Sequence, residues 1–174
     1  ALSLLATAHA AVKLPNIIGD HMLLQRDAPV RIFGTADPGE AVTISFRGQS
    51  VSTTANNLGR WEAWLAPLTP AAPAAMTINH LKIEDVLVGD VWVGSGQSNM
   101  QWSLSQAYNG DIEALASSFP NLRIISVPQV GTQDLQNDFK GQWEAATPDS
   151  VKSFSAVGFL YGRYLHEILK VPVG

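Results

Sequence analysis

Residues 86–100 read VLVGDVWVGSGQSNM, a strongly β-forming run that passes into a glycine-rich turn. The last part of the run is apolar on both faces, as in strands of parallel sheets that are covered on both sides. Residues 121–128 form a second run of this kind, and apolar residues spaced by three and four over 153–169 predict an amphipathic helix. Residues 171–174 then read as the first residues of a third strand. The alternation of strands and helices predicts a parallel α/β sheet.

Residues upstream of this sheet follow a different pattern, in which short β-type runs alternate with turn residues. The turn at residues 37–40 (DPGE) places proline and glycine where a β-turn accepts them. Strands at intervals of about 8–12 residues with turn signals are typical of an all-β sandwich. We therefore predict a β-sandwich-like domain over 11–85, followed over 86–174 by the first part of the α/β sheet. The expected strand runs are 29–34, 41–46, 49–54, 61–65 and 76–83.

The two ends of the chain carry predictions of their own. Residues 1–10 (ALSLLATAHA) combine a short apolar stretch with a small-x-small ending, which is typical of the end of a secretory signal peptide. This predicts a periplasmic or secreted protein. At the other end, an amphipathic helix leads into an unfinished strand, so we expect this chain to be the N-terminal part of a longer protein. No apolar stretch reaches the roughly 20 residues that a membrane span needs, so no membrane partner is expected.

Composition excludes several classes of function. The chain of 174 residues has no cysteine, which excludes disulfide scaffolds, cysteine-ligated zinc, iron–sulfur clusters and thiol nucleophiles. Its four histidines lie far apart and show no metal-ligand spacing, so neither a metal nor another cofactor is expected. A formal net charge of −4 without a basic run argues against nucleic acid as a partner.

Ser98 is the candidate catalytic residue. It follows Gly94 and Gly96 directly after a strand, and ligand sites in open α/β sheets lie beyond the carboxyl ends of the strands. At the start of the next helix, its hydroxyl would face the crevice and its backbone N–H could stabilise an oxyanion. The spacing departs from the G-x-S-x-G elbow because Met100 stands where that motif has glycine. Spacing alone leaves a purely structural serine as the commoner case.

Residues 89–100 (GDVWVGSGQSNM) closely resemble the nucleophile block of the sialate O-acetylesterase family, carbohydrate esterases of the SGNH hydrolase superfamily. Weaker similarities occur along the rest of the chain, in the same order as in the family, at 14–26, 119–123, 154–166 and 171–174. The resemblance implies a flavodoxin-like α/β domain behind a β-rich N-terminal domain. It also implies that Ser98 removes acetyl groups from sialic acid or from a polysaccharide such as xylan.

The resemblance also suggests roles for the neighbours of Ser98. The backbone N–H of Ser98 would contribute to the oxyanion hole. Gly96, Gln97 and Asn99 would support the turn, and Gln101 and Trp102 are the candidates for contacts with the acetylated carbohydrate.

This chain lacks a recognisable base for Ser98. A serine hydroxyl attacks efficiently only when a base, normally a histidine oriented by a carboxylate, removes its proton. The family takes this pair from an Asp-x-x-His motif near its C-terminus, and none of the nine aspartates here has histidine three positions later. His21, His80 and His166 are better explained as structural residues. The C-terminal remainder of the protein is thus the expected partner that supplies Asp and His, and the isolated chain is expected to be inactive.

One alternative from a different functional class stays open. The β-rich region could be a non-catalytic carbohydrate-binding or interaction module that carries a relic serine turn. Trp61, Trp64 and Trp102 would then be the candidate sugar platforms, although core packing is the more common use of Trp61 and Trp64 in a strand.

Overall fold

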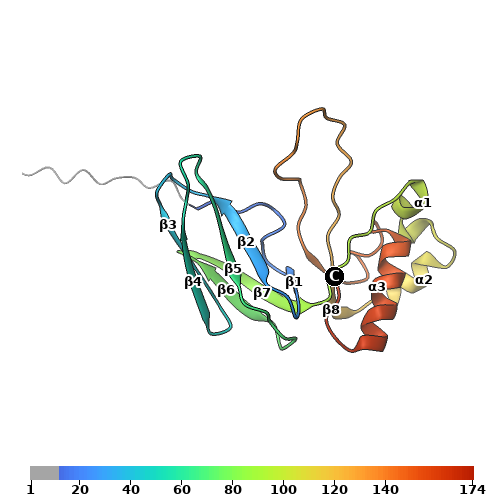
Figure 1. The fold of residues 1–174 in the computed structure, drawn as a ribbon. Coiled ribbons are helices and arrows are strands. Elements are labelled where there is room, and N and C mark those ends of the chain that lie inside the picture. Colours follow the sequence, from blue (N-terminus) through green and yellow to red (C-terminus); the bar gives the residue numbers. More distant parts are fainter. Residues whose placement is uncertain (1–11) are drawn as a thin grey trace, which may run out of the picture.

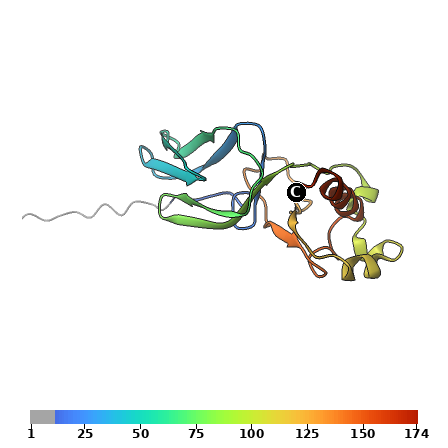
Figure 2. The same ribbon diagram turned by 90° about the horizontal axis from the view of Figure 1, so that it is seen from below.

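The computed structural model describes residues 12–174, which form two parts that lie side by side (Figure 1). The prediction for residues 1–10 falls outside this range. Seen from below, the two parts are clearly separated and the C-terminus lies between them (Figure 2). The strands are β1 (Leu23–Gln25), β2 (Val30–Thr35), β3 (Ala41–Phe46), β4 (Gln49–Thr54), β5 (Arg60–Leu65), β6 (Ala74–Ile78), β7 (Leu81–Gly89), β8 (Phe119–Ile124) and β9 (Glu144–Ala146). The helices are α1 (Ser98–Gln101), the 3₁₀ turn η1 (Leu104–Gln106), α2 (Gly110–Leu115) and α3 (Ala156–Leu169).

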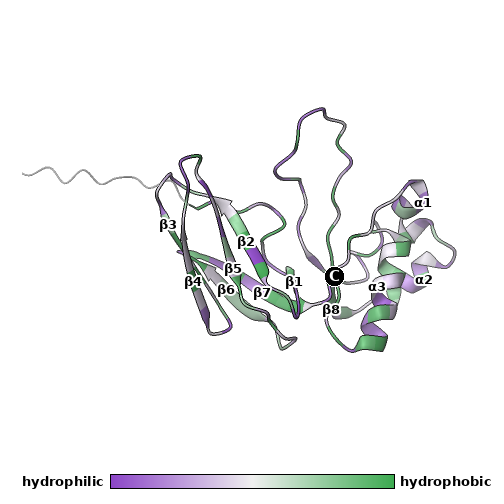
Figure 3. Cartoon of the chain, in the orientation of Figure 1, coloured by the Kyte–Doolittle hydropathy of each residue, from purple (hydrophilic) through white to green (hydrophobic). Residues whose placement is uncertain are grey.

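The first part combines a five-stranded sheet, in the order β1-β7-β6-β3-β4, with a two-stranded ribbon of β2 and β5. The sheet is mixed, because β1 runs parallel to β7 while the other neighbours are antiparallel. Four of the expected strand runs match β2 to β5 to within a residue at each end. They could be predicted because apolar and polar residues alternate along a half-buried strand, a pattern visible along β2 in Figure 3.

Alternation also corrects one prediction about the tryptophans. On β5, Trp61 is 4% exposed and packs in the first core, but Trp64 is 53% exposed. Successive side chains of a strand point to opposite faces. Trp61 and Trp64 are three positions apart, so their side chains lie on opposite faces of β5. Trp64 lies opposite Arg31 of β2 on the outer face, so the prediction that it belongs to the core is wrong.

The single run expected over 76–83 is instead a hairpin of β6 and β7. The chain turns at Asn79 and His80, and Asn79 adopts a φ of 50°, a left-handed conformation that asparagine tolerates well. The Asn79 side chain accepts a hydrogen bond from the backbone N–H of Thr43 and donates one to the carbonyl of Ala41. The turn is therefore tied to β3, which the local apolar pattern of residues 76–83 does not reveal.

The second part has its own core, in which Phe159 of α3, Leu122 of β8 and Leu104 are each buried. Val173 lies between two other segments, with parallel bridges to Asp90 on one side and to Leu122 on the other. This is the parallel pairing that the sequence predicts, although it extends over only a few residues. The short strand β9 pairs antiparallel with β8 and is not among the strands expected from sequence. Ser155 caps α3 by accepting a hydrogen bond from the N–H of Gly158.

The strand β7 connects the two parts without a break. Val86, Leu87 and Val88 are buried in the first core, and the chain then continues through Gly89 to the bridge at Asp90. Gly89 packs directly against residue 172, because the N–H of Asp90 donates to the carbonyl of Pro172 at 2.9 Å. A Cβ at position 89 would overlap that carbonyl oxygen.

We expect Gly89→Ala to lower the free energy of unfolding by about 1–3 kcal/mol, since overpacking forces a shift of backbone that cannot yield easily. Denaturant unfolding measures this change. Gly131→Ala is the matched control, because nothing lies within 4 Å of a Cβ built there; it should stay within about 0.5 kcal/mol. Equal stability of the two variants would contradict the tight packing at Gly89.

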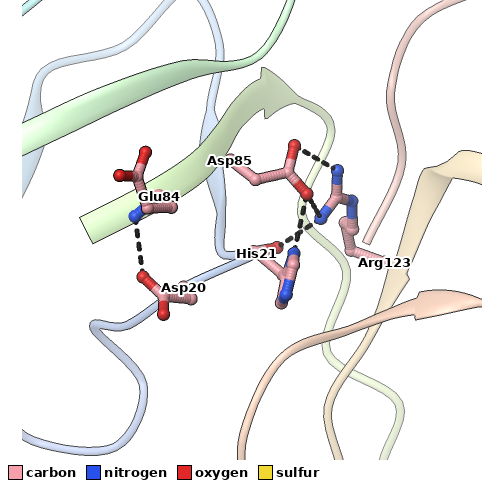
Figure 4. Close-up of polar contacts among 5 residues, drawn as sticks. All are labelled: Asp20, His21, Glu84, Asp85 and Arg123. Atoms are coloured by element: carbon pink, nitrogen blue, oxygen red, sulfur yellow. Dashed lines mark hydrogen bonds and ion pairs between the residues drawn. The ribbon is translucent and has the colours of Figure 1, made fainter.

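An ion pair between a buried arginine and a partly buried aspartate also joins the two parts (Figure 4). Arg123 of β8 is 3% exposed and donates from Nη1 and Nη2 to the two carboxylate oxygens of Asp85 on β7, at 2.7 and 3.0 Å. The imidazole Nδ1 of His21 lies 2.7 Å from the same carboxylate. The hydrogen bond from Arg123 is the main cause that lowers the pKa of Asp85, and the one from His21 adds to it.

Among residues 12–174, no helix combines the length and the apolar character that crossing a bilayer requires.

Candidate functional site

The site lies where the chain leaves the parallel bridge at Asp90. Residues 91–97 extend away from the sheet, and Ser98 begins the short helix α1 with Gln97 as its N-cap residue (Figure 1). Ser98 is exposed. Its hydroxyl has no hydrogen-bond partner among the residues that the structure describes. The sequence thus correctly places this serine at a helix start and open to solvent. It does not follow directly on a strand as predicted, because β7 ends at Gly89 and an extended segment lies between.

Met100 holds the turn in place. Its backbone N–H donates to the carbonyl of Gln97 at 2.8 Å, and its sulfur accepts a hydrogen bond of 3.6 Å from the hydroxyl of Ser155. A Cβ at Gly96 would lie 3.4 Å from the Cβ of Met100, and one at Gly94 would lie 3.7 Å from its sulfur. Both are ordinary contacts, and neither glycine has a positive φ. The glycines leave space beside Ser98 without being required by the backbone.

The supporting role expected of Gln97 and Asn99 is not seen in this structure. Both residues are exposed, and within residues 12–174 neither side chain forms a hydrogen bond to the turn. The turn is held by the backbone and by Met100 instead. Gln97 and Asn99 are therefore left free to contact a bound molecule.

The two residues expected to contact substrate lie at the end of α1. Gln101 is exposed and accepts a hydrogen bond of 3.3 Å from the side chain of Gln129. Trp102 is 51% exposed, and its carbonyl accepts from the N–H of Ala156 at 2.8 Å. The indole of Trp102 is thus available at the surface while its backbone is tied to the start of α3.

In the part of the chain that the structure describes, no histidine is hydrogen-bonded to Ser98. His21 pairs with Asp85, and the Nδ1 of His166 lies 2.6 Å from the carbonyl of Val171, to which it donates. His80 is in the turn between β6 and β7. Residues 12–174 also hold no cluster of three or more His, Asp or Glu side chains that could bind a metal.

Asp90 forms an ion pair at the start of the segment that leads to Ser98. Its carboxylate accepts hydrogen bonds from Nε and Nη2 of Arg26, at 2.7 and 3.2 Å. This ion pair links the residue that follows β7 to the residue that follows β1. Asp90 therefore fixes the strand that leads to Ser98 and takes no part in the turn.

Sequence reasoning missed the two side chains that hold α1 from outside. Gln129 and Ser155 contact Gln101 and Met100 across separations of 28 and 55 residues. Neither residue has a chemical signature, since glutamine and serine are ordinary in loops and helix caps. Only the folded chain brings them to the site.

Comparison with known proteins supports the resemblance. The sialate O-acetylesterase of Homo sapiens is 31% identical over 192 aligned residues, which cover 97% of this chain and 37% of that protein. The mouse (Mus musculus) sialate O-acetylesterase is 30% identical over 97% of this chain and 36% of its own length. Among solved structures, a carbohydrate acetylesterase from Xanthomonas citri matches with a TM-score of 0.89 and 34% identity, over 94% of this chain and 39% of that one. No family model matches the chain.

These matches have two consequences. The mixed α/β fold described above is similar to that of a carbohydrate acetylesterase. The chain also spans less than two fifths of the length of each of these relatives. Nearly all of this chain aligns with them, at an identity of about one residue in three. This chain is therefore similar to sialate O-acetylesterases over nearly its whole length, which confirms the resemblance carried by residues 89–100.

Proposed function

We propose that this chain is the nucleophile-bearing part of a carbohydrate O-acetylesterase, with Ser98 as the nucleophile. The observation that carries the proposal is the exposed, unpartnered hydroxyl of Ser98 in a chain similar to sialate O-acetylesterases. A nucleophile must be reachable by its substrate and free to receive a base. The substrate class is acetylated sialic acid or an acetylated polysaccharide such as xylan.

The proposed reaction passes through an acyl-enzyme. The Oγ of Ser98 attacks the acetyl carbonyl, its proton goes to a base, and the sugar hydroxyl leaves after protonation. The backbone N–H of Ser98 is a candidate donor to the oxyanion, since it makes no hydrogen bond to any other turn residue in 12–174. Water then hydrolyses the acetyl ester and regenerates the free serine. Each half-reaction needs a proton acceptor near Ser98.

We propose that an Asp–His pair supplied by a further part of the protein is this acceptor. Two facts support this partner. Within residues 12–174, His21 and His166 make other contacts and His80 lies in the turn between β6 and β7. The relatives are more than twice as long as the matched segment. On this proposal the isolated chain is inactive, and the part that follows β7 is the start of an SGNH-type domain behind a sandwich-like domain. The first core includes Val86, Leu87 and Val88, so the sandwich-like part extends beyond the boundary predicted at residue 85. The proposed export, to a periplasm or the exterior, depends on residues 1–10 alone.

Labelling of the full-length protein with a serine-directed fluorophosphonate tests the proposal. We expect one modified serine, identified by peptide mass spectrometry as Ser98. The Ser98→Ala variant should not be labelled, whereas Ser95→Ala, which changes an exposed serine of the same turn, should be labelled normally. Absence of labelling in the wild-type protein, together with retained glycan binding, would favour the binding module. Trp61 cannot be a sugar platform in that binding module, because it is buried.

A further inference from the structure

A surface pocket of about 340 Å³ lies among segments that the proposed mechanism does not use, at 124–128, 140–144 and 150–154. One wall is the chain that leaves β8, residues 124–128. The other wall is residues 150–154, which lead into α3. Neither segment was a candidate for function from sequence.

The first wall belongs to an unusually long connection. Residues 125–143, between β8 and β9, form neither helix nor strand and rise between the two parts of the molecule (Figure 1). Loops longer than about 12–15 residues without secondary structure are uncommon in compact domains and are usually functional when ordered. This loop is therefore a feature that needs an explanation beyond connecting two strands.

The base of the loop is held firmly. The side chain of Asn16 donates to the carboxylate of Asp138 at 2.8 Å and to the carbonyl of Phe139 at 2.7 Å, and its backbone N–H donates to Asp138 at 2.9 Å. A Cβ at Gly141 would lie 2.8 Å from the carbonyl oxygen of Ser126, so the two limbs of the loop meet there. The pocket thus has a fixed floor, although the outer part of the loop is exposed.

A residue next to each wall contacts the helix that begins with Ser98. Gln129, which follows Pro128 of the first wall, donates to Gln101. Ser155, which follows Phe154 of the other wall, donates to the sulfur of Met100. Two independent contacts therefore connect the rim of the pocket to α1, the helix that carries the proposed nucleophile.

The lining has the chemistry that sugars require. Ser126, Gln142 and Ser153 offer hydroxyl and amide groups for the many hydroxyls of a sugar ring, and Phe154 with Pro128 offers apolar surface for its C–H groups. Lys140 is exposed and forms no hydrogen bond or ion pair with any residue of 12–174. Gln142 already donates to Glu144 at 3.2 Å, so the lining donors without a hydrogen bond in residues 12–174 are the side chains of Ser126, Ser153 and Lys140.

We propose that this pocket binds the sugar part of the acetylated substrate and holds the ester at Ser98. The inference rests on the proposed function and adds a glycan-binding subsite to it. Lys140, Ser153 and Gln142 are its polar contacts. Ester recognition at Ser98 and sugar recognition in the pocket are then separable, because an ester without a sugar needs only the nucleophile and its base.

The ratio of two kcat/KM values in the full-length protein tests the subsite. One substrate is a glycan ester, whichever of acetylated xylan and O-acetylated sialic acid is hydrolysed faster, and the other is p-nitrophenyl acetate. We expect Lys140→Ala and Ser153→Ala each to lower the ratio of kcat/KM for the glycan ester to kcat/KM for the small ester by about tenfold. A change of this size corresponds to the loss of one hydrogen bond in the transition state. Both side chains are exposed, so neither change removes core packing.

Leu135→Ala is the matched control, because Leu135 is 96% exposed on the same loop and does not line the pocket. Its ratio should equal that of the wild type. An unchanged ratio in both pocket variants of an active enzyme would overturn the subsite while leaving the esterase intact. If the wild-type protein hydrolyses neither ester and Ser98 is not labelled, the proposed function itself fails, and the subsite falls with it.

Discussion

Replacing Ser98 by alanine in the full-length protein is expected to lower kcat/KM for acetyl esters by at least about 10⁴-fold. The reason is chemical, because alanine has no oxygen that can form the acyl-enzyme, and any remaining activity depends on direct attack by water. The measurement is the initial rate of acetate release from an acetylated glycan and from p-nitrophenyl acetate. Stability should not change, since the Ser98 side chain is exposed and has no partner in residues 12–174.

Two variants make this result specific. Ser95→Ala removes a hydroxyl from the same glycine-rich turn and should keep activity within about twofold of wild type, as expected of an exposed residue outside the chemistry. Thermal unfolding of Ser98→Ala should match that of the wild type. A fully active Ser98→Ala protein would show that the resemblance in residues 89–100 does not extend to mechanism.

The second large effect concerns the ion pair between the two parts. Asp85→Asn should lower the free energy of unfolding by about 2–4 kcal/mol, because it leaves the buried guanidinium of Arg123 without its charge partner. The Nε of Arg123 already lacks a partner in this structure, so little remains to compensate the charge. Asparagine keeps the backbone effect small, since Asp85 has a φ of 56° and asparagine tolerates the left-handed region. Denaturant unfolding with a fitted slope measures the change.

The controls separate burial from charge. Glu62→Gln removes one partner of the exposed Arg31–Glu62 pair and should cost less than about 0.5 kcal/mol. The double variant Asp85→Asn/Arg123→Met should recover part of the loss, because no buried charge is left.

The lowered pKa of Asp85 also predicts how the effect of Asp85→Asn depends on pH. Its stabilisation is present above the ordinary pKa of about 4 and is lost as the pH falls through the lowered value, so wild type and Asp85→Asn should converge in acid. A difference that persists there would contradict this assignment.

Four strands of the first part, β2 to β5, could be predicted because one face of each strand is buried and the other is exposed, and this shows in the sequence. β2 to β5 alternate with period two, and glycine, proline or asparagine marks their turns. The alternating pattern did not predict structure that depends on contacts with another strand. Asn79 breaks an apolar run through hydrogen bonds to β3, and β9 is too short to show a period at all.

The candidate site likewise has one part that could be predicted from the sequence and one part that could not. Ser98 could be placed from sequence, because a buried strand followed by a glycine turn and a helix is a local pattern. The side chains that hold α1 could not, because Gln129 and Ser155 reach it only through tertiary packing. The same is true of Arg123, whose partner Asp85 is 38 residues away on another strand.

The uninterrupted path of β7 limits how the molecule can be cut. A recombinant fragment that starts at residue 86 would take Val86, Leu87 and Val88 out of the first core and expose them as an unpaired edge. A fragment that stops at residue 85 would leave β1 without its parallel neighbour. Deletions, domain swaps or fusion junctions at this point would therefore destabilise both parts. A loss of function in such fragments would be explained by misfolding and would not identify catalytic residues.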